Sequence, residues 1–242
     1  MSDLPVVERG RLLSELAATL ATLPTDRVQT WRLGEAVRRM LRADGVAITL
    51  GYLSDSRITL CATSEVAAAL ESLQEVLGQG PGFEAARNDV VVVADLDGDA
   101  DERWPMLAQT LESRYGSLRV YAVPVHANGR LGGVATLHTG WQQSLAEPAD
   151  HMAFLVNAVG AALVTDAATH PEGHLQSGDG WSSRSLVHQA TGMVMAQVRV
   201  TPEDALALLR GHAYALATDI NDVAQRVVGR SVNFSDFNVE GD

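Results

Sequence analysis

The sequence predicts an α+β fold followed by a separate helical module. Strand-like stretches occur as neighbouring pairs, at residues 46–52 with 57–63 and at 119–125 with 131–137, and helical stretches lie before, between and after them. Adjacent hairpins favour an antiparallel sheet with helices packed on it. After the Gly-, Pro- and Ser-rich segment 166–183, only helical spacing remains. We therefore expect a sheet-containing domain, a linker and a small helical bundle.

Length and composition agree with two soluble domains. The chain has 242 residues, of which 46% are hydrophobic, enough to form packed cores. No apolar run approaches the roughly 20 residues that a membrane-spanning helix needs. The N-terminus lacks a basic segment followed by an apolar run, so we expect no signal peptide, no membrane and a cytoplasmic location.

Charge and cysteine content limit the chemistry. The net charge of −12 argues against general binding of nucleic acids or anionic membranes by the whole chain. All 18 basic residues are arginine, whose planar guanidinium suits phosphates and base edges. Cys61 is the only cysteine, which excludes an intrachain disulfide. We interpret it as a small core residue, with a redox or ligand-attachment role as the alternative.

The first domain opens and closes with helices. Leu12, Leu13, Leu16, Leu20 and Leu23 form one apolar stripe at helical spacing, and a long last helix is expected from Pro148 to about residue 165. Between them we expect helices at 26–41, 64–75, 83–87 and 104–115, strands at 46–52, 57–63, 90–93, 119–125 and 131–137, and a hairpin turn at Asn128-Gly129.

The second domain consists of three predicted helices. The first covers about 184–198, the second begins at Thr201-Pro202, and Asp219 is expected to cap the third. Gly192 lies in the middle of the first helix, where glycine costs about 1 kcal/mol relative to alanine. Either a closely packed helix or an approaching ligand could compensate, and the sequence leaves both open.

The first domain resembles a GAF domain over about residues 26–165. The resemblance rests on the Gly80-Pro-Gly82 turn before Phe83-Glu-Ala-Ala, Arg103-Trp-Pro105, and Val-Pro124-Val with Gly132-Gly-Val-Ala-Thr. It implies a small-molecule sensor or dimerisation module whose pocket lies between the sheet and the loops around the short helix. Many relatives have cysteine where this chain has Gly82. The resemblance identifies no cofactor, although an unidentified ligand could occupy the pocket.

No catalytic pattern is evident in the sequence. There is no Gly-Lys-Ser/Thr phosphate loop, no Gly-x-Ser-x-Gly elbow and no paired Cys/His cluster, so we expect neither an enzyme nor a metal site. His126 and His138 fall on predicted strands and are interpreted as ordinary strand positions, with haem ligation as the alternative.

The second domain resembles an ANTAR domain over about residues 180–234. His188-Gln-Ala-Thr-Gly-Met-Val-Met-Ala-Gln197, Thr201-Pro-Glu-Asp-Ala-Leu206 and Asp222-Val-Ala224 carry the resemblance. It implies a three-helix module that binds hairpins in nascent RNA and prevents terminator formation, an arrangement found after GAF domains in actinobacterial regulators. The family's RNA contacts correspond here to these candidates: Gln189, Thr191, Gly192, Arg210, Tyr214, Arg226 and Arg230.

Each candidate has a structural alternative. Arg210 and Arg226 could pair with Glu203 or Asp222, and Tyr214 could be half-buried packing. Residues 184–230 carry five arginines and four acids, whereas the remaining residues carry 13 arginines and 26 acids. The module is therefore the least acidic part of the chain, but electrostatic attraction to RNA should be modest.

Together these observations predict a cytoplasmic, signal-responsive transcription antiterminator. Residues 1–165 would form the GAF-like sensor with its N-terminal helix, 166–183 the linker, 184–234 the ANTAR output domain and 235–242 an acidic tail. The helices at 12–23 and 148–165 would form a homodimer through a coiled-coil-like bundle. The alternative is a GAF-containing signalling adaptor whose helical module contacts proteins.

Overall fold

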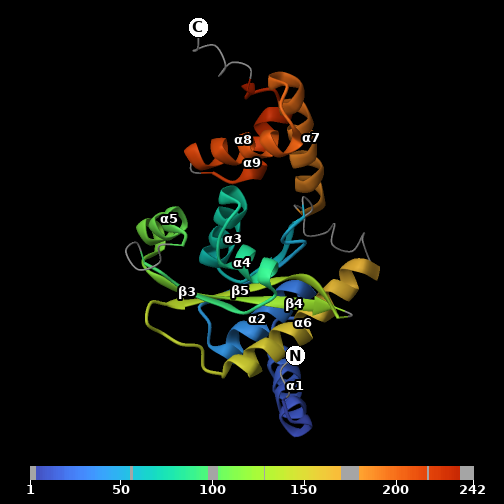
Figure 1. Cartoon of the computed structure of the whole chain (residues 1–242). Coiled ribbons are helices and arrows are strands. Elements are labelled where there is room, and N and C mark those ends of the chain that lie inside the picture. Colours follow the sequence, from blue (N-terminus) through green and yellow to red (C-terminus); the bar gives the residue numbers. More distant parts are fainter. Residues whose placement is uncertain are drawn as a thin grey trace. The chain divides into compact units, whose positions relative to one another are not determined.

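The computed structural model divides the chain into two compact units, shown in Figure 1. It describes residues 4–54, 57–97, 103–127, 129–169, 180–216 and 218–234. The first unit contains the sheet, and the second contains the last three helices. Residues 170–179 of the predicted linker and the predicted acidic tail 235–242 lie outside the described residues.

The first unit is built on a five-stranded sheet in which all neighbouring strands are antiparallel. The strand order is β2-β1-β5-β4-β3. The strands are β1 (Gly45–Leu50), β2 (Ile58–Ala62), β3 (Val92–Leu96), β4 (Leu118–Ala127) and β5 (Arg130–Gly140). The predicted α+β class with a GAF-like antiparallel sheet is therefore confirmed.

Both predicted hairpins are present. β1 pairs with β2, and β4 pairs with β5 up to Ala127 opposite Arg130, which agrees with the hairpin expected there. β3 pairs with β4 only as far as Ala122, which lies opposite Val92, so Pro124 lies beyond the end of β3. At Pro124 the strand β4 therefore has β5 as its only described strand neighbour, which suits a residue that cannot donate a ladder hydrogen bond.

Helices cover both faces of this sheet (Figure 1). On one face lie α1 (Val6–Ala21), α2 (Gln29–Leu41) and α6 (Ala149–Thr169). On the other lie α3 (Glu65–Leu77), α4 (Pro81–Asn88) and α5 (Pro105–Tyr115). The strand predicted at 90–93 is in fact β3 at Val92–Leu96, because these are the residues that pair with the start of β4.

The stripes predicted to dimerise the protein are used inside its own core. Leu12, Leu16 and Leu23 of the first stripe are buried, whereas Leu13 is 46% exposed. The inward side chains of α6 are buried in the same cluster: Met152, Leu155, Val156, Val159 and Leu163. In this chain α2 and the sheet cover these inward side chains, and the homodimer expected through the two helices stays a prediction.

The second unit is a three-helix bundle of α7 (Gly180–Val198), α8 (Pro202–Ala215) and α9 (Ile220–Val228). All three helices pack against one another. Their core is small and aliphatic: Ala190, Val194, Ala205, Leu209, Ala213, Ile220, Val223, Ala224 and Val227. Leu216 lies beyond the end of α8 and is 46% exposed.

The predicted caps are confirmed. The Asp204 backbone N–H donates to Thr201 Oγ1 (3.2 Å), and Asp219 Oδ1 accepts from the backbone N–H groups of Asn221 and Asp222 (2.8 and 2.9 Å). Such caps satisfy amides that have no partner within the helix. Within the described ranges, no helix is both long and apolar enough to cross a membrane.

Candidate functional site

The first candidate surface is the outer face of α7. Gln189 and Gly192 are exposed there, together with His188 and Ala196. A Cβ atom added at Gly192 would meet no heavy atom within 4 Å. Tight packing by a neighbouring helix therefore does not explain this glycine in the described part of the chain, and the surface next to it is open.

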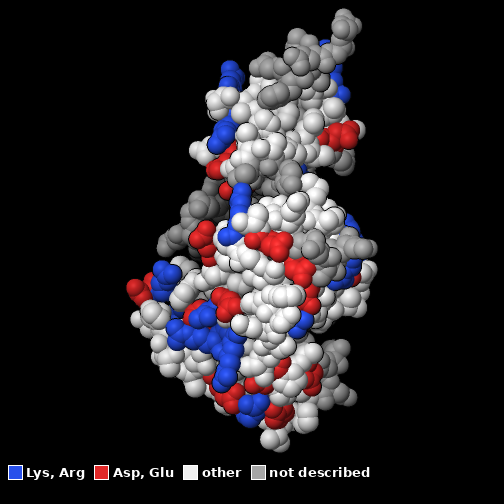
Figure 2. Space-filling model, turned by 90° about the vertical axis from the view of Figure 1, so that its left-hand side faces the viewer, with Lys and Arg blue, Asp and Glu red and all other residues white. Residues whose placement is uncertain are grey.

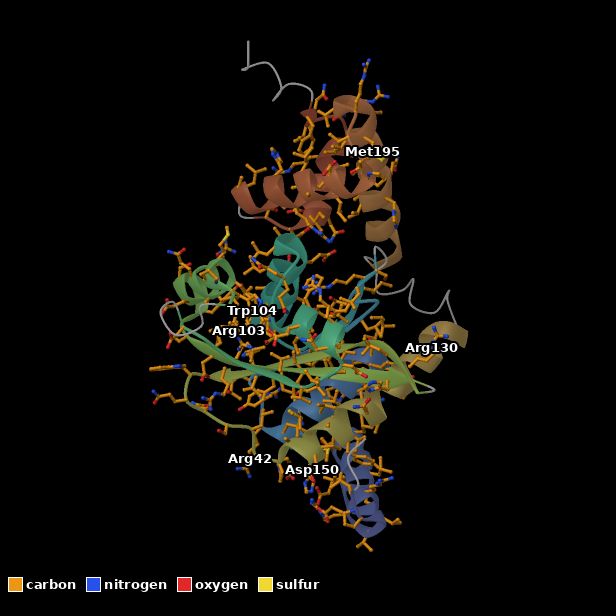
Figure 3. All side chains as sticks on the ribbon, viewed as in Figure 1. Arg42, Arg103, Trp104, Arg130, Asp150 and Met195 are labelled. Carbon is orange, nitrogen blue, oxygen red and sulfur yellow. The ribbon has the colours of Figure 1, made fainter. Side chains whose placement is uncertain are left out.

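Two residues beside this face are partly withdrawn from it. Thr191 is half-buried, and its hydroxyl donates to the backbone carbonyl of Val187 (2.8 Å). Its oxygen keeps lone pairs that could accept a further hydrogen bond. Met195, labelled in Figure 3, is half-buried and packs against the bundle core.

The α9 end of the bundle presents two exposed guanidiniums, those of Arg226 and Arg230. Asp222, the predicted alternative partner of Arg226, accepts a hydrogen bond from the Thr218 hydroxyl instead (2.6 Å). Among the residues that the structure describes, neither arginine forms an ion pair. The backbone N–H groups of Ser231 and Val232 donate to the Arg226 carbonyl (2.8 and 3.2 Å), which fixes the chain where Arg230 leaves the helix.

Arg199 and Arg230 share an unusual backbone conformation. Both follow the end of a helix, both are exposed, and both adopt the left-handed region, with φ of 56° and 60°. Glycine is the usual residue at such helix ends because a Cβ is disfavoured there. Arg199 was not among the candidates, because its orientation depends on where α7 ends, which the apolar periodicity does not define.

The two candidates on α8 are less accessible or outside the description. Arg210 is half-buried, in contrast to Arg226 and Arg230. The side chain of Tyr214 lies outside the described residues, so the packing alternative for it stays untested. The structure thus places Gln189, Gly192, Arg226 and Arg230 at the surface of one bundle.

Charge is sparse on this unit. Figure 2 shows that the visible face of the three-helix unit, in the upper part of the view, is mostly without charged side chains, with separate arginine and acidic groups. This agrees with the five arginines and four acids between residues 184 and 230. Any anion bound here would be held mainly by local contacts and only weakly by long-range attraction.

The second candidate region is the interior of the first unit, between the sheet and α3. There the buried carboxylate of Glu71 accepts hydrogen bonds from side chains that come from several elements. The donors are Thr136 Oγ1 (2.6 Å), Arg57 Nη2 (2.6 Å), Thr49 Oγ1 (2.8 Å), Tyr52 Oη (3.0 Å) and Gln74 Nε2 (3.2 Å). One carboxylate therefore ties α3 to β1, to β5 and to the segment before β2.

Aromatic side chains surround the Arg57 guanidinium. Its Cζ atom lies 4.0 Å from the ring centroid of Tyr52 and 5.2 Å from that of Phe83. The two rings meet edge to face at 5.1 Å. A Cβ added at Gly82 would collide with the Tyr52 hydroxyl. The position at which many GAF relatives carry cysteine is therefore occupied here by Tyr52.

The remaining titratable candidates have structural roles. His138 is buried, and its Nε2 lies 3.1 Å from the Oγ of Ser64, the hydroxyl that also accepts from the Ala67 backbone N–H at the start of α3. Burial lowers the pKa of His138. Cys61 is buried in the core, and burial raises its pKa to about 12. Its interpretation as a small core residue is confirmed.

His126 is held at the surface of the sheet unit by two side chains. Its Nε2 lies 2.8 Å from Asp89 Oδ1, and its Nδ1 lies 3.3 Å from Asn157 Oδ1. Both ring nitrogens thus face protein groups. Within the described residues, no group of three or more His, Cys, Asp or Glu side chains could hold a metal ion.

Comparison with protein-family models finds two matches, a GAF domain at residues 32–163 and an ANTAR domain at residues 181–228. No curated protein matches the chain. GAF followed by ANTAR is an arrangement typical of non-enzymatic regulators, and neither match is to a catalytic domain.

Several solved GAF domains are similar in fold. The GAF domain of the Acinetobacter phosphoenolpyruvate-protein phosphotransferase is 15% identical, with a TM-score of 0.45, covering 71% of this chain and 99% of its own. The corresponding domain from Coxiella burnetii is 14% identical, with a TM-score of 0.45, covering 68% and 97%. A GAF/HD domain protein from Geobacter sulfurreducens is 18% identical, with a TM-score of 0.42, covering 58% and 92%.

The GAF model matches more than half of the chain, and its range spans all five strands of the sheet. The ANTAR model spans α7, α8 and α9. The chain therefore belongs to the GAF-domain family and carries an ANTAR domain in its last three helices.

Proposed function

We propose that this protein is a cytoplasmic transcription antiterminator that binds RNA hairpins through its ANTAR domain under the control of the GAF domain. The ANTAR match implies RNA binding, and the GAF match implies a sensor. The observation that carries the proposal is the exposure of Gln189, Gly192, Arg226 and Arg230 on one small bundle. The bundle surface thus offers an open backbone at Gly192, two guanidiniums and the side-chain amide of Gln189.

This combination suits RNA loops. Single-stranded loop bases are recognised by hydrogen bonds to their edges and by stacking on planar groups, including guanidiniums. Gly192 would let an RNA backbone or base approach α7, because no atom lies within 4 Å of its absent Cβ. Arg226 and Arg230 would contact phosphates, and Gln189 would read a base edge. Thr191, Arg210 and Tyr214 stay in the proposed contact set as secondary members.

The primary test is a gel-shift titration of the full chain with an RNA that carries two hairpins, at low salt. The Arg226→Ala/Arg230→Ala double variant should lose at least about tenfold in affinity, since each phosphate contact supplies sequence-independent binding energy. Gly192→Leu should weaken RNA binding because the leucine side chain would fill the open surface. The variant should stay folded, because position 192 is exposed. Arg130→Ala is the matched control, because Arg130 is an exposed arginine on the GAF domain (Figure 3). Wild-type protein that binds no hairpin RNA at low salt would sink the proposal.

A second candidate function is that of a signalling adaptor. One observation favours it: the outer face of α8 is apolar, with Ala207, Leu208, Gly211 and Ala215 exposed. Such a face suits a protein partner better than RNA. Full regulatory activity of the Arg226→Ala/Arg230→Ala variant in cells, together with loss of activity in Leu208→Arg, would favour the adaptor over the antiterminator.

The signal would act through the GAF domain. The interior around Gly82 is filled by Tyr52, Arg57 and Phe83, so a ligand entering there would have to displace these side chains. An unidentified small molecule remains part of the proposal. Native mass spectrometry of the protein purified from its source cells would reveal a bound molecule as a mass beyond that of the chain.

A further inference from the structure

The Arg57 side chain turns inward from the surface of the first unit. Arg57 directly precedes β2, and Leu53 and Ser54, which come shortly after β1, are exposed, yet the Arg57 side chain is only 6% exposed. Its guanidinium lies in the interior between the sheet and α3. There its Nη2 atom donates to a carboxylate oxygen of Glu71 (2.6 Å) and to the Glu71 backbone carbonyl (3.0 Å). Arg57 thus attaches the chain just before β2 to α3.

The Arg57 guanidinium has the surroundings of a bound planar cation. Its Cζ atom lies 4.0 Å from the ring centroid of Tyr52 and 5.2 Å from that of Phe83, and the Glu71 carboxylate meets it from α3. Aromatic faces attract cations, and a planar guanidinium both stacks on them and forms directed hydrogen bonds with a carboxylate. A free guanidinium compound would find the same contacts here. In this structure the cation that receives them belongs to the chain itself.

The Glu71 carboxylate requires a cation beside it. Its side chain is only 3% exposed, and Arg57 is the one charged donor to it among the residues that the structure describes. The neutral donors are hydroxyl and amide groups: Thr49, Tyr52, Gln74 and Thr136. A buried carboxylate without a counter-ion is strongly unfavourable. A neutral molecule that displaced Arg57 would therefore leave Glu71 uncompensated, whereas another cation could replace Arg57 without that cost.

We propose that Arg57 occupies a binding site for small molecules that carry a guanidinium or amidinium group, and that such a molecule takes the place of the Arg57 side chain when it binds. The same carboxylate and rings would hold the incoming cation, which would enter where the Arg57 side chain now passes inward. The assignment rests on the proposed function of the GAF domain as a sensor, for which it names the class of ligand. Because Arg57 is tethered, its effective concentration at the site is high, so the ligand must be abundant or make further contacts.

Exchange of the cation would act on two neighbouring parts of the fold. Release of Arg57 would detach the chain before β2 from α3, because its Nη2 atom makes the contacts with Glu71. In the other direction, the Gln74 side chain donates from Nε2 to the Glu71 carboxylate (3.2 Å) and accepts from the backbone N–H of Gly82 at the start of α4 (2.7 Å). A shift of Glu71 on binding would thus reach α4. A sensor needs such a difference in contacts between its occupied and unoccupied states.

The first test refills the site with a free cation. Arg57→Ala removes the guanidinium and leaves Glu71 without a counter-ion, so the GAF domain should unfold at a lower temperature than in wild type. Ethylguanidinium carries the same atoms that this substitution removes. At about tenfold above its dissociation constant it should raise the unfolding midpoint of Arg57→Ala by about 2–4 °C, as measured on the full chain by calorimetry. Ethylurea has the same shape without the charge and should have no effect.

Two comparisons decide this test. Equal effects of ethylguanidinium and ethylurea, or no effect of either, would overturn the proposal. If Arg57→Ala does not fold on its own, the same titration should restore its circular dichroism with ethylguanidinium and not with ethylurea. Adding Glu71→Gln to Arg57→Ala removes the carboxylate, so the response to ethylguanidinium should disappear. A response that persists in this double variant would also overturn the proposal, because the compound would then bind elsewhere.

The second test asks whether the ligand and Arg57 compete. Calorimetric titration should give ethylguanidinium an affinity for wild type at least about tenfold lower than for Arg57→Ala, because Arg57 must first be displaced. Arg57→Lys should fall between the two, since an ammonium lacks the planar shape that stacks on Tyr52. Arg87→Ala is the matched control: Arg87 Cζ lies 5.9 Å from the Phe83 ring, but Arg87 is exposed, so the affinity should equal that of wild type. Equal affinities of wild type and Arg57→Ala, or a folded wild type that binds no guanidinium compound, would refute the exchange.

Cation binding and RNA binding are measured separately. The calorimetric titrations contain no RNA, and Arg57→Ala leaves every residue of the ANTAR domain unchanged. If Arg57→Ala binds ethylguanidinium but wild type binds no hairpin RNA at low salt, the cation site stands and the proposed RNA function fails. If wild type binds hairpin RNA but Arg57→Ala binds no ethylguanidinium, the RNA function stands and the cation site fails.

Discussion

Three arginines follow helix ends in the left-handed conformation: Arg42, Arg199 and Arg230, with φ of 53°, 56° and 60°. A residue with a Cβ costs roughly 1–2 kcal/mol in this region relative to glycine, and strain of this kind often accompanies function. Arg199 and Arg230 flank α7 and α9 of the ANTAR domain, whereas Arg42 follows α2 of the GAF domain (Figure 3). At each of these three positions glycine would relieve the backbone strain, so each arginine can be tested by a change to glycine.

Arg230→Gly separates stability from binding. The free energy of unfolding of the ANTAR domain should rise by up to about 1 kcal/mol, less any gain in the entropy of the unfolded chain. Affinity for hairpin RNA should fall, and the salt dependence of binding should decrease by about one phosphate contact. Denaturant titration and gel shifts at several salt concentrations measure the two effects. Arg42→Gly is the control, which should alter stability alone; an Arg230→Gly protein with unchanged RNA affinity would remove Arg230 from the contact set.

We expect His138 to make the stability of the GAF domain depend on pH. Burial lowers its pKa because the charged imidazolium is poorly solvated, while the nearby Asp44 carboxylate acts weakly in the opposite direction. Below the ordinary histidine pKa of about 6.5, the unfolded chain binds this proton and the folded chain does not. The free energy of unfolding should therefore fall as the pH decreases through about 6.5, and the loss should continue until the lowered folded pKa is reached.

A comparison of His138→Gln with wild type isolates this contribution. Between pH 7.5 and 5.5, wild type should lose more stability than the variant, with a difference in slope below about 1.4 kcal/mol per pH unit, the limit for one proton. Urea titrations at a series of pH values give the slopes. The same variant also tests the contact with Ser64, whose loss would lower stability at all pH values alike. Parallel curves for the two proteins would mean that His138 titrates normally.

At the scale of the elements, α3 is fixed to the sheet by a polar contact that is buried. Arg57 and Glu71 have side chains only 6% and 3% exposed and approach to 2.6 Å. Removing one member of such a pair leaves a buried charge without compensation, at a cost of about 3–5 kcal/mol. Glu71→Gln should therefore destabilise the GAF domain by about this amount, as measured by denaturant unfolding.

The double variant Arg57→Met/Glu71→Leu distinguishes the pair from general packing loss. It removes both charges together, so it should cost less than the sum of Arg57→Met and Glu71→Leu measured separately. Glu71→Leu leaves the donors on Thr49, Tyr52, Gln74 and Thr136 without this acceptor in the single and the double variant alike, so the difference between these two variants reports on Arg57. Strictly additive costs would show that the ion pair contributes nothing beyond its separate members.

The elements that the sequence predicted well are those fixed by local signals. Thr201 and Asp219 mark helix starts because a cap needs only a residue and the amides two or three positions later. The pairing of β4 with β5 was likewise predictable from the Asn-Gly turn signal between them. The buried stripes of α7 and α9 were predictable because their small aliphatic residues recur at helical spacing, which places them on one face of each helix.

What the sequence could not predict depends on distant residues. The Glu71 network joins positions 49, 57, 71 and 136, and nothing local marks these as neighbours. Five leucines between residues 12 and 23 shared one helical stripe, but only the position of α2 and the sheet decided that Leu12 faces inward and Leu13 outward. At Gly192 the sequence left a packed helix and an approaching ligand equally open, and only the structure shows that the space beside it is open.

At the scale of the whole molecule, the low positive charge limits how strongly one ANTAR domain can hold RNA. The net charge of −12 opposes RNA, and the ANTAR domain offers few free cations to offset it. A monomer should therefore bind one hairpin poorly at physiological salt. Two ANTAR domains held by one dimer would bind two hairpins of one RNA at a high effective concentration, without any new contact.

The last prediction compares RNAs with one and two identical hairpins. If the protein is the expected homodimer, it should bind the two-hairpin RNA at least about 10²-fold more tightly, because two linked ANTAR domains bind two hairpins at a high effective concentration. Fluorescence anisotropy gives both affinities. RNA binding should also promote dimerisation, since linkage between two equilibria is reciprocal. Equal affinities for the two RNAs would mean that the two ANTAR domains are not linked in one dimer.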